Sequence, residues 1–287
     1  MFKKIKEKCK NLLILGRYNS PVGAILLMWP CYWGCLSANV ITTNTIQDLI
    51  YLTIGSFVMR GAGCCVNDIF DKNYDKEIKR TKNRPLASGK LEIRESIYFI
   101  FFQLLIGLIV VLQFEIKIII TSFIVIPFVI IYPLFKRFTY FPQAILGLIF
   151  NWGIIIGYMS QSENFSTSVL YLYFAGVFLT IAYDTVYGFQ DIQEDKKLGL
   201  KSLSILFENK KNYLLIVYFL SFIFFSTFFF KNYSNNLFNF FCSSIIAYFL
   251  LRQFFAFKKG FNLMNIFKSN IIFGGLVSVL FIIQYYL

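Results

Sequence analysis

The chain contains no histidine, and this absence removes the side chain that most often acts as a general base or binds a metal ion. Any acid–base or metal chemistry must therefore use carboxylates, tyrosines, lysines or water. The six cysteines form neither a CxxC pair nor a zinc-type spacing, so they predict no zinc site and no redox motif. Charged residues are scarce as well, at 15% of the chain, whereas a soluble domain has about 25%.

Apolar residues are abundant instead, at 57% of 287 residues, and the mean hydropathy is +0.62. They fall in repeated runs close to the ~20 residues that a helix needs to cross a bilayer. We therefore predict an all-α, multi-span membrane bundle, a single domain over 1–287, with about nine transmembrane helices in two similar four-helix halves plus one. The predicted spans are about 20–40, 49–66, 97–114, 116–134, 141–160, 169–188, 213–230, 237–256 and 271–287.

The basic residues are distributed unevenly between the loops. Net charge is +13, and 25 of the 28 Lys and Arg residues lie before the first span or at the loops after spans two, four, six and eight. The exceptions are Lys117, Lys231 and Arg60. This bias follows the positive-inside rule, so it places the N-terminus in the cytoplasm and argues against a nucleic-acid partner. The same side holds a basic lead-in on anionic lipid and two catalytic loops, at 1–19, 67–96 and 189–212.

Two sets of acidic residues follow predicted spans on this side of the membrane. Asn67, Asp71 and Asp75 are four residues apart, which puts three oxygen-bearing side chains on one face of a helix. The second set ends the sixth span and consists of Asp184, Asp191 and Asp195. Any one of these acids alone is as well explained by solvation in a loop. Two sets, each at the end of a span, favour one shared site.

Oxygen ligands without histidine or cysteine favour a hard ion, and Mg²⁺ is usually held by one or two carboxylates together with substrate phosphates. Two acidic sets that face each other therefore predict a magnesium clamp on a diphosphate, at the edge of an apolar bundle that suits a lipid tail. Arg84, Lys136 and Arg137 are candidates for the remaining phosphate oxygens, although most loop lysines serve as orientation signals. Arg60 lies inside a span and needs a partner, either the substrate or an intramembrane acid.

These motifs resemble those of the UbiA superfamily of intramembrane prenyltransferases. The first motif of that family, NDxxDxxxD, matches residues 67–75, and RTKNRPLASG follows it at 80–89. The second motif is similar to YDTVYGFQDIQED at 183–195. Segments 132–154 and 17–30 resemble the branch of the family that acts on 4-hydroxybenzoate.

The resemblance implies transfer of a polyprenyl group from polyprenyl diphosphate to the ring of 4-hydroxybenzoate, ortho to its hydroxyl, in ubiquinone biosynthesis. Mg²⁺ is the implied cofactor, and its implied ligands are Asp71, Asp75, Asp191, Asp195 and Asn67. The implied catalytic set is these four aspartates with Arg137. The implied substrate-binding residues are Asn67, Arg60, Arg84, Lys136, Tyr183, Asp184 and Arg17.

Several alternatives stay open at this point. The proton that leaves the ring passes to Asp191, Asp184, water or the released diphosphate. The acceptor is alternatively homogentisate, haem, dihydroxynaphthoate or another ring, and a cation transporter is a more distant alternative. The expected surroundings are membrane lipid, in the inner membrane of a bacterium with the site facing the cytoplasm, or in the mitochondrial inner membrane.

Overall fold

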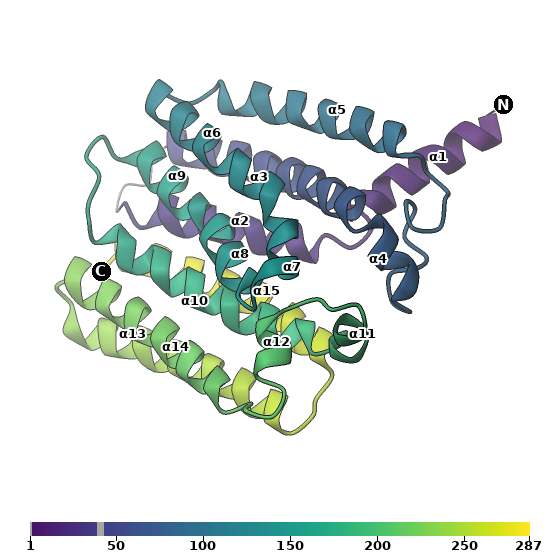
Figure 1. Cartoon of the computed structure of the whole chain (residues 1–287). Helices are drawn as coiled ribbons and strands as arrows, with labels where there is room; N and C mark the ends of the chain where they lie inside the picture. The colour runs from purple at the N-terminus through teal and green to yellow at the C-terminus, as the bar shows by residue number, and fades with distance from the viewer. Residues whose placement is uncertain (1, 39–42) are drawn as a thin grey trace.

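The computed structural model describes residues 2–38 and 43–287. Within these residues every regular element is a helix, as the sequence predicted (Figure 1). Eight segments there are long and apolar enough to cross a membrane, and one further apolar helix, α2 (Val22–Leu36), is shorter, so the expectation of about nine is confirmed. The eight are α3 (Thr43–Phe70), α5 (Ile93–Val111), α6 continued through η1 and α7 (Ile116–Phe138), α8 with α9 (Pro142–Gln161), α10 (Val169–Gly188), α13 (Tyr213–Asn232), α14 (Asn236–Lys258) and α15 (Leu263–Tyr285).

Three membrane helices differ clearly from their predicted limits. Helix α15 begins at Leu263, well before its predicted span of 271–287. The sequence predicts a span over about 20–40, but α2 ends at Leu36, and residues 39–40 lie outside the described part of the chain. Helix α3 is longer than its predicted span of 49–66 at both ends. Hydropathy detects only the apolar middle of such a helix, so its polar last turn, which carries Asn67 and Asp68, is missed.

The membrane segment Pro142–Gln161 is broken in its middle. Helix α8 (Pro142–Phe150) is separated from α9 (Trp152–Gln161) by the single residue Asn151. The Asn151 amide nitrogen donates hydrogen bonds of 2.9 Å to the Gly147 carbonyl and of 2.9 Å to the Thr180 hydroxyl. A broken helix needs such partners because lipid offers none to its free polar groups.

Helices α2 and α9 pack closely because glycines line their contact. A Cβ atom on Gly34 would lie 2.0 Å from the Ile154 carbonyl oxygen, and one on Gly157 would lie 2.1 Å from the Cys31 carbonyl oxygen. Small residues allow two membrane helices to bring their backbones together in this way. The main hydrophobic core lies beyond this contact, among α2, α10, α13, α14 and α15.

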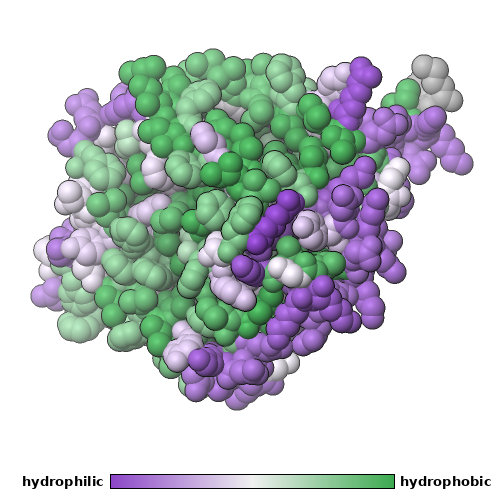
Figure 2. Space-filling view, in the orientation of Figure 1, coloured by the Kyte–Doolittle hydropathy of each residue, from purple (hydrophilic) through white to green (hydrophobic). Residues whose placement is uncertain are grey.

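Helices α5 and α6 (Ile116–Ile131) leave most of their apolar side chains exposed, whereas α10 is largely buried. Figure 2 shows apolar side chains over most of the visible face, which is the surface that contact with lipid tails requires. The chain is thus an integral membrane protein.

Short helices gather at one end of the bundle. Helices α1 (Phe2–Leu15), α4 (Lys72–Glu77) and α11 (Ile192–Lys197) lie at the right of Figure 1, where Figure 2 shows hydrophilic side chains. The other short elements are η1 (Tyr132–Leu134), α7 (Phe135–Phe138) and α12 (Leu203–Leu206). We call this end, which holds residues 67–75 and 184–195, the acidic end.

Candidate active site

The first acidic set lies where α3 ends and α4 begins. Asn67 and Asp68 occupy the last turn of α3, Asp71 is the residue before α4, and Asp75 lies within α4. The carboxylates are nearly inaccessible, since only 1% of Asp68, 2% of Asp71 and 4% of Asp75 is exposed. They are therefore not solvated loop acids, and each needs a partner for its buried charge.

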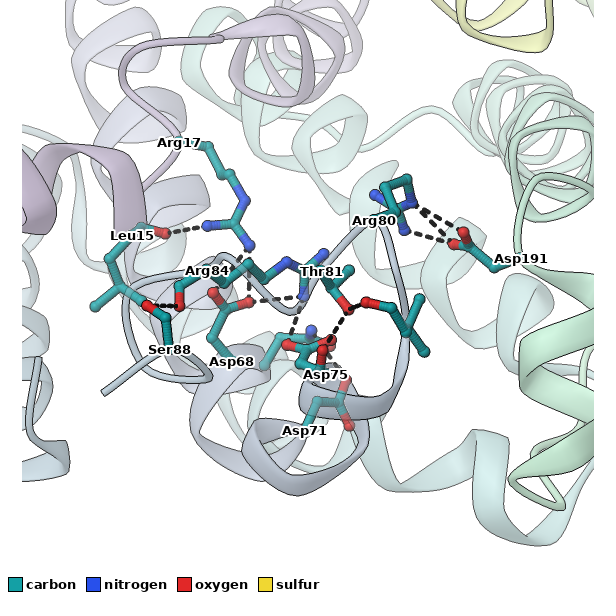
Figure 3. A network of polar contacts seen from close by, with 12 residues as sticks. Leu15, Arg17, Asp68, Asp71, Asp75, Arg80, Thr81, Arg84, Ser88 and Asp191 are labelled. Atoms are coloured by element: carbon teal, nitrogen blue, oxygen red, sulfur yellow. Dashed lines mark hydrogen bonds and ion pairs between the residues drawn. The ribbon is translucent and has the colours of Figure 1, made fainter. Parts of the chain in front are cut away.

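Arginines neutralise two of these acids (Figure 3). The Arg84 Nη1 atom donates hydrogen bonds to Asp68 at 3.1 Å and to Asp75 at 2.8 Å, and so joins α3 to α4. Arg17 donates to both Asp68 oxygens, at 2.8 and 2.9 Å, and to the Leu15 carbonyl at 2.9 Å. The Arg17 backbone has a φ of 63°, a left-handed conformation that is unusual for a residue other than glycine.

Asp71 is held by a lysine from the other side of the site. Lys136, in α7, donates to Asp71 Oδ2 at 2.5 Å, and Asn67 Nδ2 donates to the same oxygen at 3.1 Å. The other oxygen, Oδ1, is buried and has no hydrogen-bond partner among the described residues. Burial raises the pKa of the Asp71 carboxyl above its ordinary value, although Lys136 opposes the shift.

The second acidic set faces the first. Arg80, from the loop after α4, donates through Nε to the two Asp191 oxygens at 2.9 and 3.1 Å (Figure 3). Its Nη1 atom donates to the Tyr187 hydroxyl at 3.2 Å. The Lys79 backbone N–H donates to Glu194 at 3.3 Å. Two loops whose contacting residues are 111 positions apart in the sequence are therefore joined directly over the site.

Asp195 forms no ion pair with any described residue, in contrast to Asp71, Asp75 and Asp191. Burial and the neighbouring Asp191 raise the pKa of Asp195 to about 6, while Lys136 and Arg80 act in the opposite direction. Asp71 raises it further, so carboxylates of the two sets lie close enough to repel one another. Such repulsion is relieved when a cation binds between them.

A large cavity of about 1000 Å³ reaches from the acidic end into the bundle, and Asn67 and Asp68 of the first set and Asp184 of the second line it. Its polar lining is confined mainly to that end and includes Arg17, Arg60, Asn67, Asp68, Arg80, Arg84, Asp184 and Tyr187. The remaining wall, built from α2, α3, α5, α6, α8 and α9, is mostly apolar. The volume is at the upper end of the ~300–1,000 Å³ of small-molecule sites, so it suits a polar head with a long apolar tail.

Arg60 points its guanidinium into this cavity from α3. It lies over the Phe150 ring, 5.5 Å from the centroid, and Nη1 donates to the Cys64 sulfur at 2.9 Å. A Cβ on Gly23 would lie 2.7 Å from Arg60 Nε, so the glycine makes room for this side chain. Asp184 lines the same cavity, yet Arg60 forms no ion pair with it or with any other described residue, and Nε has no hydrogen-bond partner there. The guanidinium is thus open to an anionic group.

The acids fit a hard divalent cation by their chemistry, although they do not form a finished metal site. Within the described chain no three acidic or cysteine side chains converge as metal ligands, since Asp71, Asp75 and Asp191 each pair with a base. Mg²⁺ needs only one or two carboxylates when phosphates and water supply its other ligands. The unpartnered Oδ1 of Asp71 and the unpaired Asp195 are the positions open to such an ion.

Most of the predicted site residues come together, and two lie at its margin. Tyr183 is buried in α10 with its ring 5.6 Å from that of Phe267, while Tyr187, one turn later, lines the cavity. Arg137 donates to the Phe70 carbonyl at 2.8 Å and so supports the turn between α3 and α4.

Three further residues belong to the site although the motifs do not single them out. Arg80 holds Asp191, Tyr187 accepts a hydrogen bond from Arg80, and Phe150 lies beneath Arg60. Spacing gives a signal for Tyr187, which precedes Asp191 by four residues. Arg80 begins the family-like segment at 80–89 but is one base among many in its loop. Phe150 is one of 36 phenylalanines, so composition does not distinguish it.

Known proteins share these features. The model of the UbiA prenyltransferase family matches residues 27–262. A 4-hydroxybenzoate octaprenyltransferase of Francisella tularensis subsp. novicida is 35% identical, over 98% of this chain and 99% of its own. The chain belongs to the UbiA prenyltransferase family. A second similar protein is 4-hydroxybenzoate geranyltransferase 1 of Lithospermum erythrorhizon. It is 40% identical to this chain, over 67% of this chain and 63% of its own.

Solved structures of UbiA homologues have the same fold. The apo homologue from Aeropyrum pernix K1 superposes with a TM-score of 0.78 at 21% identity, covering 91% of this chain and 97% of that one. A homologue from Archaeoglobus fulgidus bound to GPP and Mg²⁺ superposes with a TM-score of 0.71 at 18% identity, covering 96% and 98%. The chain is therefore a UbiA prenyltransferase in both sequence and fold, and an enzyme.

Proposed function

We propose that this UbiA enzyme transfers a polyprenyl group from polyprenyl diphosphate to the ring of 4-hydroxybenzoate, ortho to the hydroxyl, with Mg²⁺ as cofactor, in ubiquinone biosynthesis. The observation that carries the proposal is the cavity, which joins two acidic sets and an unpaired arginine to a long apolar wall. Relatives named as 4-hydroxybenzoate octaprenyltransferase and geranyltransferase support the acceptor. The homologue bound to GPP and Mg²⁺ supports the donor and the cofactor.

The proposed Mg²⁺ ligands are Asp71, Asp75, Asp191 and Asp195, with Asn67 assisting. Bound Mg²⁺ would neutralise the diphosphate and so make it a better leaving group. Three of these carboxylates are bound to bases, and guanidinium and ammonium groups bind phosphate as well as carboxylate. We infer an exchange of partners on donor binding, in which the bases turn to the diphosphate oxygens. The bases are Arg80, Arg84 and Lys136.

The proposed acceptor pocket is the part of the cavity around Arg60. Its guanidinium has no carboxylate partner among the described residues, and the carboxylate of 4-hydroxybenzoate supplies one. The apolar face of Phe150 lies directly beside it and suits an aromatic ring. Asp184 and Asn67 line the same space, so the ring would lie near the diphosphate site.

The reaction needs a leaving group, a nucleophilic ring carbon and a proton acceptor. As the allylic C–O bond breaks, its electron pair leaves with the diphosphate, and the ring carbon ortho to the hydroxyl forms the new C–C bond. The ring then loses the proton of that carbon and becomes aromatic again. Asp184 is our candidate to receive this proton, because it lines the cavity unpaired, whereas Asp191 is held by Arg80.

Purified enzyme in detergent tests the proposal. It should transfer a prenyl group to 4-hydroxybenzoate with Mg²⁺, and a chelator should abolish the reaction. Asp71→Ala and Asp191→Ala should each lose most of the activity, while Glu77→Gln, an exposed acid of α4, should retain it. Undiminished turnover in either aspartate variant would defeat the metal assignment.

The proposed location is the inner membrane of a bacterium, with the acidic end in the cytoplasm, and membrane lipid as the surroundings. The charge bias of the loops supports this orientation. Residues 1–19, 67–96 and 189–212 would then form the cytoplasmic lead-in and the two catalytic loops of one domain.

A further inference from the structure

One line of residues along α3 runs the length of the cavity. Tyr51, Gly55, Met59, Gly63 and Asn67 are each four residues apart, and all five line the cavity. Asn67 belongs to the acidic end, and Tyr51 lies sixteen residues earlier, which is about 24 Å along a helix that rises 1.5 Å per residue. The two glycines therefore lie between the polar head of the site and its far end.

The glycines keep this part of the cavity open. A Cβ on Gly55 would be 3.7 Å from Val110 of α5, and one on Gly63 would be 3.8 Å from Val129 of α6. Both distances are ordinary van der Waals contacts, so a side chain can begin at either position without a clash. A longer side chain would continue into the cavity and fill it.

The opposite wall consists of α5 and α6, and it opens towards the side of the bundle. Leu105 and Phe123 line the cavity and are also exposed, at 46% and 49%. A residue that is at once cavity wall and outer surface marks an opening, and here the outer surface is apolar. A lipid tail can therefore enter or extend sideways between these helices without passing through water.

Aromatic rings close the far end. The rings of Tyr51 and Phe114 meet edge to face at 5.9 Å, and Ile118 beside them is 2% exposed. The Tyr51 hydroxyl accepts a hydrogen bond from Gln47, which fixes the ring at the end of α3 away from the acids. The cavity thus has a polar head, an apolar middle and a defined floor.

Larger side chains of α2 and α15, such as Leu27 and Phe267, line the cavity on its other side. Phe267 of α15 packs against the rings of Tyr183 at 5.6 Å and Tyr187 at 4.5 Å. Leu27 of α2 is half-buried against the hydrophobic core. These side chains bound the cavity here, whereas Gly55 and Gly63 bound it by backbone alone.

We propose that the prenyl tail of the donor lies along Gly63, Met59 and Gly55 of α3, between α3, α5 and α6, and that Gly55 and Gly63 determine how long a tail the enzyme accepts. The inference rests on the proposed function for the donor and adds the path of its tail. Gly63 lies four residues from Asn67, about 6 Å, and Gly55 twelve residues, about 18 Å. A block at Gly63 must therefore exclude shorter tails than a block at Gly55.

The test compares Gly63→Leu and Gly55→Leu with the unmodified enzyme, using Mg²⁺, 4-hydroxybenzoate and donors of one to eight isoprene units. For each variant the ratio of activity with long donors to activity with the one-unit donor should fall by at least about tenfold, because an overfilled pocket rejects added methylenes. The fall should begin at a shorter donor for Gly63→Leu than for Gly55→Leu. Replacing glycine in a helix should also favour folding rather than impair it.

Two controls make the result decisive. Ile54→Phe adds bulk to the lipid-exposed face of α3, outside the cavity, and should leave the length profile unchanged. Leu27→Phe adds bulk to the α2 wall. A length limit that appears in Leu27→Phe and not in Gly55→Leu would overturn the proposal, and so would an equal loss with every donor.

Donor binding separates this inference from the proposed function. The rise in melting temperature with Mg²⁺ and donors of each length, measured without acceptor, should show the same ordered limits. If the unmodified enzyme gives no product with 4-hydroxybenzoate but the binding limits appear, the acceptor assignment fails and the tail path stands. If binding is independent of length in both glycine variants, the tail path fails.

Discussion

Single charged residues determine what the acidic end can bind. Asp68, Asp71 and Asp75 are buried, and each is compensated by a base from another part of the chain. Arg60 is the contrasting case, because it forms no ion pair with any described residue and Asp184 acts on it only at longer range. A buried charge without a partner costs several kcal/mol. A substrate that displaces the bases from the aspartates must therefore bring a cation, and a substrate that binds Arg60 must bring an anionic group.

Arg60→Gln tests the acceptor pocket at this scale. We expect the KM for 4-hydroxybenzoate to rise about 10- to 100-fold, since a hydrogen bond to a charged group contributes about 1.5–3 kcal/mol. The KM for the donor should change little. Arg252→Gln, at an exposed position of α14, is the matched control and should behave as the unmodified enzyme. A rise confined to the donor KM would contradict the assignment.

Asp195 predicts how the metal requirement depends on pH. Burial and Asp191 raise the pKa of Asp195 to about 6, and a carboxyl must lose its proton to bind a metal ion. Protons therefore compete with Mg²⁺ below pH 6, and the Mg²⁺ concentration for half-maximal activity should rise up to about tenfold per pH unit there. It should be constant above about pH 7. Asp195→Asn should abolish the dependence, and a flat profile in the unmodified enzyme would refute the role.

At the scale of whole helices, packing between α2 and α9 determines where one wall of the cavity lies. The contact between α2 and α9 leaves no space for a Cβ at Gly34 or Gly157. This close approach holds the α2 wall of the cavity against α9, where Gly153 and Ile156 line the same space.

Gly157→Ala should destabilise the protein by about 1–3 kcal/mol, the usual cost of overpacking, because the added carbon would meet the Cys31 carbonyl at 2.1 Å. Thermal unfolding in detergent measures the effect as a lower melting temperature. Gly275→Ala is the control, since its Cβ would be 3.4 Å from Trp29, and it should be neutral or slightly stabilising. Equal melting temperatures for the two variants would argue against the close contact.

The sequence predicts the helices better than their interruptions. Long apolar runs identify the membrane segments because lipid imposes a minimum length on each. The break at Asn151 lies in such a run, and Asn151 there forms a hydrogen bond to Thr180 of another helix, α10. The pairing of Arg80 with Asp191 depends on how two loops meet. Both contacts join residues that are far apart in the sequence, so the local sequence pattern does not predict them.

The spacing of the acids gives a local signal for the first acidic set. Asn67, Asp71 and Asp75 lie together, although the predicted single helix is interrupted at Asp71, between α3 and α4. Backbone hydrogen bonds from Asp71 to Asn67 and from Asp75 to Asp71 keep the four-residue repeat through this turn. The left-handed backbone of Arg17 and its contact with Asp68 have no such local signal, since few residues other than glycine adopt this conformation.

The whole molecule is an apolar bundle with one strongly charged end, and its orientation can be tested with a native thiol. Cys9 in α1 is exposed, whereas the other five cysteines are buried. A membrane-impermeant maleimide should label Cys9 in inverted inner-membrane vesicles and not in intact spheroplasts. Cys9→Ser should remove the signal in both. Labelling of intact spheroplasts at Cys9 would place the acidic end outside.

Competition between acceptors tests the central claim most directly. Purified enzyme with Mg²⁺ and one polyprenyl diphosphate is given 4-hydroxybenzoate, homogentisate and dihydroxynaphthoate together, and products are identified by mass. We expect the prenylated 4-hydroxybenzoate to dominate, and Arg60→Gln to reduce that product most. Prenylation of another ring while 4-hydroxybenzoate remains unchanged would contradict the account.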